Sequence, residues 1–139
     1  MKTIYLRILS AVFIILSLCF AENDGTEEVW NGVNAFYNYN TIDAIEILTQ
    51  ARFDYPENPA VHLTWAAAKW LHNQAANSVN ESYTILQRDL DEIIPIYNEL
   101  VSQYPDNPQY GLFLGSAKGV KARVHLGKKE WLSTLIVAY

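Results

Sequence analysis

Hydrophobic residues recur every three or four positions along most of this chain, and short polar or proline-containing segments separate the runs. This spacing puts apolar side chains on one face of a helix. It predicts an all-α protein of about six helices, over residues 27–37, 42–55, 59–73, 83–104, 108–126 and 129–139. Because the connections are short, we expect consecutive helices to pack as antiparallel pairs.

The residues at the ends of these runs indicate where the helices begin. Pro59 fits the first position of the third helix, where its missing N–H is no loss. The side chain of Asn40 or Thr41 is expected to cap the second helix, and that of Asn80 or Ser82 the fourth. Each cap would accept a hydrogen bond from a backbone N–H that has no partner within its helix.

Two residues bear on the later helices. Pro95 lies inside the fourth run, where it removes the hydrogen bond to the carbonyl of Asp91. The apolar stripe keeps its register on both sides of Pro95, so we expect a kink near Asp91 and not a break. Gly127 is expected to end the fifth helix as a left-handed cap.

The beginning of the chain has a different pattern. Lys2 and Arg7 precede a largely apolar run over residues 8–20, and Ala21 is followed by three polar residues. This order is typical of a secretory signal peptide with cleavage after Ala21. The run is shorter than the roughly 20 residues of a bilayer-spanning helix, which favours a leader over the alternative, a membrane anchor that is retained. The sequence therefore predicts a signal peptide over 1–21 and an exported domain over 22–139, in the periplasm or cell envelope.

Loss of the leader changes the chemistry of the remaining chain. Cys19 is the only cysteine, so the mature chain would fold without a disulfide. Lipidation at Cys19 fits poorly, because Leu18 stands where a small residue is required. Removing Lys2 and Arg7 leaves 8 basic residues against 15 acidic ones, and the formal net charge goes from −5 to −7. An acidic chain of this kind argues against nucleic acid as a partner.

Basic residues gather near the end of the chain, over 118–129, after an acidic segment over 89–99. In one interpretation, two neighbouring helices complement each other across their exposed faces. In the other, the basic end docks on an anionic surface.

A five-residue word occurs twice, as Tyr-Pro-Glu-Asn-Pro over 55–59 and as Tyr-Pro-Asp-Asn-Pro over 104–108. Each copy follows one predicted helix and leads into the next. Internal duplication at this scale is typical of a solenoid, in which each helix pair buries its apolar side against the next pair.

The first helix pair resembles a tetratricopeptide repeat (TPR), a family whose repeat has roughly 34 residues. Its small and bulky residues have the same spacing from one another as in that family, and a proline ends the unit. The matching residues are Gly32, Ala44, Leu48, Ala51 and Pro56. Small residues at helix crossings let two backbones approach.

The later units match less well. Pro56 and Pro105 are 49 positions apart, and residues 71–83 look like an insertion. Ile93 stands where the second helix of the family's repeat has alanine. The resemblance implies a TPR-like α-solenoid of exported bacterial type, with units over about 27–58, 59–107 and 108–139.

The resemblance also implies a partner-binding surface on the first helix of each pair, for a protein or a peptide. Carried over position by position, this surface comprises Val33, Phe36, Tyr37, Leu63, Ala67, Trp70, Leu112 and Ser116. In the alternative interpretation these residues are ordinary packing between helices, as aromatic stripes frequently are.

No catalytic or cofactor-binding pattern stands out. The histidines, His62, His72 and His125, are scattered and lack the spacing of a metal site. We therefore expect a non-enzyme with no catalytic residue, no cofactor and no bound metal.

Two further patterns have structural interpretations. Gly111, Gly115 and Gly119 form no phosphate loop, and their four-residue spacing on a helix indicates close helix packing. Asp89 and Glu92 are a pair of carboxylates on a helix face that we expect to be solvated, with no cleft implied.

The last run carries an apolar face, with Trp131, Leu135, Ile136 and Tyr139, whereas a solenoid normally ends on a polar helix. A partner or further repeats would cover this face, or the chain is a fragment of a longer protein. The sequence thus predicts a non-catalytic scaffold or adaptor that binds a protein or peptide. The alternative is a non-catalytic helical region of a longer cell-envelope enzyme or assembly factor.

Overall fold

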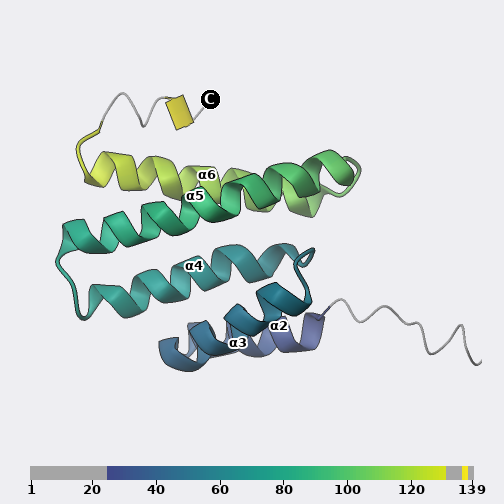
Figure 1. Ribbon diagram of the computed structural model, residues 1–139, viewed down its shortest axis with the longest axis horizontal. Coiled ribbons are helices and arrows are strands. Elements are labelled where there is room, and N and C mark those ends of the chain that lie inside the picture. Colours follow the sequence, from purple (N-terminus) through teal and green to yellow (C-terminus); the bar gives the residue numbers. More distant parts are fainter. Residues whose placement is uncertain (1–24, 131–135, 138–139) are drawn as a thin grey trace, which may run out of the picture.

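The computed structural model describes residues 25–130 and 136–137, and these form helices joined by short connections, with no strand among them (Figure 1). The expected all-α class is confirmed for this part of the chain. The helices are α2 (Thr26–Tyr37), α3 (Thr41–Asp54), α4 (Pro59–Gln74), α5 (Val79–Gln103) and α6 (Pro108–Gly127). The expected leader over 1–21 lies outside the described residues, as does most of the sixth predicted helix, including Trp131, Leu135 and Tyr139.

The helices pack in chain order, and consecutive helices run antiparallel (Figure 1). In addition α4 packs closely against both α2 and α6, whereas the backbones of α3 and α5 do not come close to each other. The helices α2, α4 and α6 therefore form one side of the domain, which we call the first-helix side. Their N-terminal ends all lie at the same end of the molecule (Figure 1).

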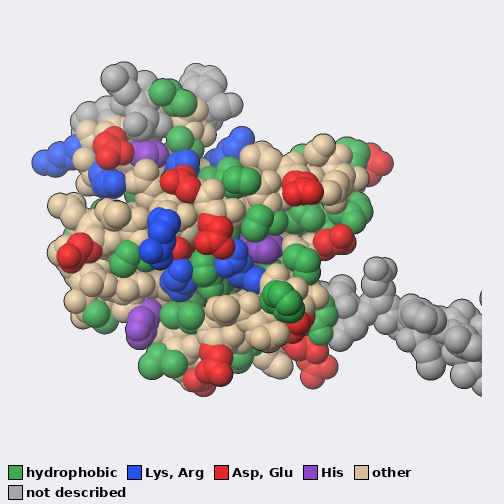
Figure 2. All heavy atoms as spheres, in the orientation of Figure 1, with side chains coloured by type: hydrophobic (Ala, Val, Ile, Leu, Met, Phe, Trp, Pro, Cys, Tyr) green, Lys and Arg blue, Asp and Glu red, His purple; other side chains and the backbone are tan. Residues whose placement is uncertain are grey.

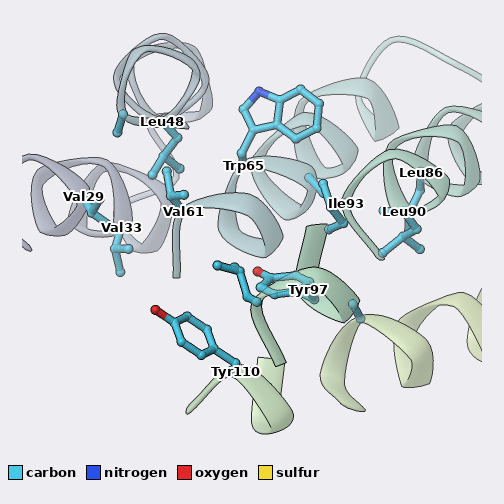
Figure 3. Close-up of a cluster of buried hydrophobic side chains, with 14 of the residues drawn as sticks. Val29, Val33, Leu48, Val61, Trp65, Leu86, Leu90, Ile93, Tyr97 and Tyr110 are labelled. Carbon is cyan, nitrogen blue, oxygen red and sulfur yellow. The ribbon is translucent and has the colours of Figure 1, made fainter. Parts of the chain in front are cut away.

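One continuous core runs through the five helices (Figure 3). It extends from Val29 and Leu48 in the first helix pair to Leu86 in α5. Tyr97 lies near its centre and is fully buried; its hydroxyl donates to the carbonyl of Pro59 (2.6 Å) and accepts from the backbone N–H of Leu63 (3.0 Å). This side chain thus ties α5 to the first turn of α4.

The two copies of the repeated word form turns of the same geometry. The Tyr at each helix end has φ near −130° (−132° for Tyr55, −126° for Tyr104), and its N–H donates to the residue four positions before. The Asn in each turn then caps the next helix, since Asn58 accepts from the N–H of Ala60 (3.1 Å) and Asn107 from that of Gln109 (3.0 Å). The duplication in sequence is therefore a duplication in structure.

Two expected N-caps differ from the structure. The cap of α5 is Ser78, not Asn80 or Ser82, because Glu81 stands three residues later and completes a capping box. Asn40 does precede α3, but its side chain donates to Asp43 (2.6 Å) and accepts no backbone bond.

The expectation for Pro95 agrees with the structure, and the expectation for Gly127 does not. Helix α5 continues through Pro95 without a break, as expected. Gly127, however, is not a left-handed cap: α6 includes it, and the positive φ of 63° falls on Lys129. Gly127 is instead placed against Tyr83, whose ring would lie 2.6 Å from an added Cβ.

The three glycines of α6 are also not at a helix crossing. All three are exposed, and a Cβ added to Gly111, Gly115 or Gly119 would meet nothing within 4 Å. The expectation of close packing was therefore wrong for the residues that the structure describes, because the apolar contacts of α6 are made by another face, which carries Tyr110, Ala117 and Val124.

Candidate functional site

The residues expected to bind a partner lie on α2, α4 and α6, and they differ in exposure. Val33 is buried in the core, and Leu63 and Trp70 are half-buried and pack against it. Tyr37 and Leu112 project into solvent, with 74% and 68% of their surface exposed. Of these residues, Tyr37 and Leu112 thus have the most surface to offer a partner.

Three other residues that were expected to bind a partner offer it less apolar surface. The Phe36 ring packs edge-on against Tyr37, with 5.3 Å between ring centroids. Ala67 is half-buried, and the exposed Ser116 hydroxyl donates to the carbonyl of Leu112 (2.8 Å).

A hollow lies where the two repeated turns meet the start of α2, and its volume is about 1100 Å³. We call it the corner hollow. Its volume lies slightly above the range of small-ligand pockets, roughly 300–1,000 Å³. Its lining comprises Thr26, Val29, Trp30, Asp54, Tyr55, Pro56, Glu57, Asn58, Pro59, Ala60, Tyr104, Asn107, Gln109, Tyr110, Leu112 and Phe113. Of the residues expected to bind a partner, Leu112 is the one that lines this hollow.

Aromatic rings and carboxylates share this hollow. Trp30 is 60% exposed, and the rings of Tyr104 and Tyr110 lie 5.4 Å apart. Burial raises the pKa of Tyr110, and the negative charge of Glu57 raises it further. In Figure 2, green and red side chains occur at the right-hand end of the molecule, where the turns lie, while Lys and Arg gather over the middle and the left.

The repeated word in the sequence marks this hollow, but the residues expected to bind a partner lie mostly elsewhere. The first copy of the word Tyr-Pro-acid-Asn-Pro, over 55–59, lines the hollow with all five residues, and the second copy contributes Tyr104 and Asn107. The word predicted the corners of the fold correctly, but Trp30, Tyr104 and Tyr110 were not among the expected site residues. Their proximity depends on how α2, α5 and α6 are packed together in the fold, which no local pattern gives.

On the side of α4 that faces α3 and α5, a cluster of charged side chains surrounds Trp65. Arg52 and Lys69 lie over its ring, 3.8 Å and 3.9 Å from the centroid, and its N–H donates to Thr49 (3.0 Å). Arg52 also pairs with Glu92 (2.6 Å). These cations are engaged within the fold, and this arrangement stabilises the packing of α3, α4 and α5.

Asp89 belongs to the same cluster and corrects the expectation of a solvated face. Only 1% of its side chain is exposed, and it accepts from Lys69 (2.9 Å) and from Arg88 (3.2 Å). The reason is that α5 turns this position toward α4, while Glu92 stays 53% exposed. A buried carboxylate with two cationic partners is a structural ion pair.

His62 is buried and holds the first corner. Its Nε2–H donates to the carbonyl of Pro56 (2.7 Å), and its Nδ1 accepts from Arg52 (3.2 Å), which requires the neutral ring. Burial is the main cause that lowers the pKa of His62, and the neighbouring Arg52 lowers it further.

The other two histidines also have partners. The ring of His72 lies 3.1 Å from the Thr41 hydroxyl, and that of His125 lies 2.6 Å from a Glu130 carboxylate oxygen. Among residues 25–130 and 136–137, no group of three or more His, Cys, Asp or Glu side chains is arranged to hold a metal ion.

Two of the basic residues over 118–129 have acidic partners. Lys121 lies 2.5 Å from Asp91 on α5, and Lys128 lies 3.6 Å from Glu130. The contact between Lys121 and Asp91 agrees with the interpretation in which the two helices complement each other. In the described part of the chain, every helix is too short or too polar to cross a membrane.

Compared with protein-family models, with curated proteins and with solved structures, the chain matches none of them.

Proposed function

We propose that this chain is an exported helical-repeat scaffold or adaptor of TPR-like architecture, which binds a protein or peptide partner and catalyses no reaction. The observation that carries the proposal is the order of helix contacts. Each helix packs on the next, and α4 packs in addition against both α2 and α6, which links the first helices of successive pairs. In a helical solenoid, such a side is the usual site of partner binding.

The packing of the first pair supports the same proposal. A Cβ added to Gly32 would lie 2.6 Å from Leu48, so glycine is required for this close crossing. Ala44, Leu48 and Ala51 are all buried. These are residues on which the resemblance to the TPR family rests.

The exposed side chains of the first-helix side make the proposal testable. The full-length chain with a C-terminal affinity tag is cross-linked in cells of its source and captured. The test variant replaces both Tyr37 and Leu112 with alanine. The matched control replaces Ile42 and Phe53, which are also exposed (65% and 83%) but lie on α3.

We expect the wild type and the α3 control to recover the same partner, and the Tyr37/Leu112 variant to recover much less of it. Thermal unfolding followed by circular dichroism checks that both variants fold. Equal recovery by all three proteins, or equal loss in the control, would contradict binding through the first-helix side.

A further inference from the structure

The corner hollow has an acidic lining. Its charged lining residues in the described part of the chain are Asp54 and Glu57. Gln50 donates to one carboxylate oxygen of Asp54 (2.9 Å), and the other oxygen can accept from a ligand. The charge of Glu57 already acts on Tyr110 across the hollow. A cationic ligand is therefore favoured over an anionic one.

The helix ends around the hollow do not reverse this preference. Helix N-termini attract anions through their free N–H groups. Here, however, α4 and α6 both begin with proline, which has no N–H, and the next N–H of each helix is bound to Asn58 or Asn107. The third helix that begins at the hollow, α2, carries Glu27 and Glu28 in its first turn, and their negative charge opposes the binding of an anion there. The C-terminal ends of α3 and α5 meet at the same corners, and helix C-termini favour cations.

Aromatic rings at the hollow provide a second kind of contact. Trp30 presents a largely exposed ring, and Tyr104 keeps 39% of its surface open. A guanidinium or ammonium group binds over the face of such rings. The fold already uses this contact at Trp65, which lies between Arg52 and Lys69.

We propose that the corner hollow binds a segment of a partner protein in which an arginine or lysine stands next to an apolar side chain. The cation lies between Asp54, Glu57 and the face of Trp30, and the apolar neighbour contacts Leu112. This inference rests on the proposed function and names the chemistry of the partner.

The test begins with a display library of random heptapeptides, selected on the immobilised full-length chain. The best peptide is then synthesised, and its affinity is measured by fluorescence anisotropy. The test variant is Asp54→Asn with Glu57→Gln. The matched control is Asp43→Asn with Glu46→Gln, which removes the same charge from exposed positions on α3 outside the hollow.

We expect selected peptides to be enriched in Arg or Lys beside an apolar residue. The test variant should bind the best peptide about tenfold or more weakly, because hydrogen bonds to charged groups are among the strong ones. The control should bind as the wild type does. Peptide should also shift the indole N–H signal of Trp30 in NMR spectra, and binding should weaken as salt is raised.

Other outcomes overturn the inference. Enrichment of neutral or acidic peptides, or equal affinity for both charge variants, would show that the carboxylates are not the contact. Dimers that dissociate in the test variant would identify a second copy of the chain as the occupant. If the Tyr37/Leu112 variant loses its captured partner while the Asp54/Glu57 variant keeps it, the inference falls and the proposed function stands. If no variant changes capture and no peptide is enriched, both fall.

Discussion

Replacing Tyr97 with phenylalanine removes a single hydroxyl from the centre of the core. That hydroxyl joins the carbonyl of Pro59 to the N–H of Leu63, at 2.6 Å and 3.0 Å. The ring would keep its place between His62 and Phe113, whose centroids lie 5.7 Å and 6.1 Å away. The change therefore tests the two hydrogen bonds and leaves the apolar contacts in place.

The expected cost follows from what the two backbone groups can do without the hydroxyl. A buried polar group left without a partner costs about 1–3 kcal/mol. Pro59 and Leu63 are four residues apart, so a slightly tighter first turn of α4 could bring them together directly. We therefore expect Tyr97→Phe to lower the free energy of unfolding by about 1–2 kcal/mol, or the melting temperature by roughly 4–16 °C.

The measurement is urea unfolding of both proteins followed by circular dichroism, with thermal unfolding as a second measure. Tyr37→Phe is the control, since the Tyr37 side chain is exposed and its hydroxyl should contribute little. A loss below about 0.5 kcal/mol for Tyr97→Phe, or an equal loss for Tyr37→Phe, would refute the claim that this hydroxyl ties α5 to α4.

Three further outcomes follow from the packing and from the shifted pKa values. Gly32→Ala should lower the free energy of unfolding by about 1–3 kcal/mol, because the added methyl group overpacks against Leu48. Gly115→Ala lies in open space on α6 and should raise it by about 0.5–1 kcal/mol. Urea midpoints that move in the same direction for both variants would contradict this. The lowered pKa of His62 favours the neutral ring in the fold, so stability should fall as the pH drops below about 6.5, and His62→Gln should flatten the loss measured between pH 7 and pH 5. Burial raises the pKa of Tyr97, so the protonated phenol stabilises the fold and stability should fall above about pH 10; alkaline unfolding profiles should be less steep for Tyr97→Phe.

The ends of the helices were within reach of the sequence because they depend on near neighbours. Proline at the first position and asparagine one residue earlier act within a single turn, and both corners have the expected form. The cap of α5 was misplaced only by the choice among nearby polar residues, although Ser78 and Glu81 had the required spacing. Local rules of this kind need no knowledge of the rest of the fold.

Which side chains are exposed, and which distant residues contact each other, were decided by the tertiary structure. Asp89 was expected in solvent, but it lies in the interface between α4 and α5, where Lys69 meets it from the other helix. Gly127 was expected to cap a helix, but it makes room for Tyr83, more than forty residues earlier in the chain.

The candidate site likewise depends partly on local sequence and partly on tertiary packing. The sequence by itself determined that two closely similar turns exist and that the chain is helical. Only the packing of α2, α4 and α6 brought those turns, 49 positions apart, to the same end of the molecule as Trp30. The physical reason is that a helical pattern determines which side chains share a face, whereas contacts between distant segments depend on how those faces pack.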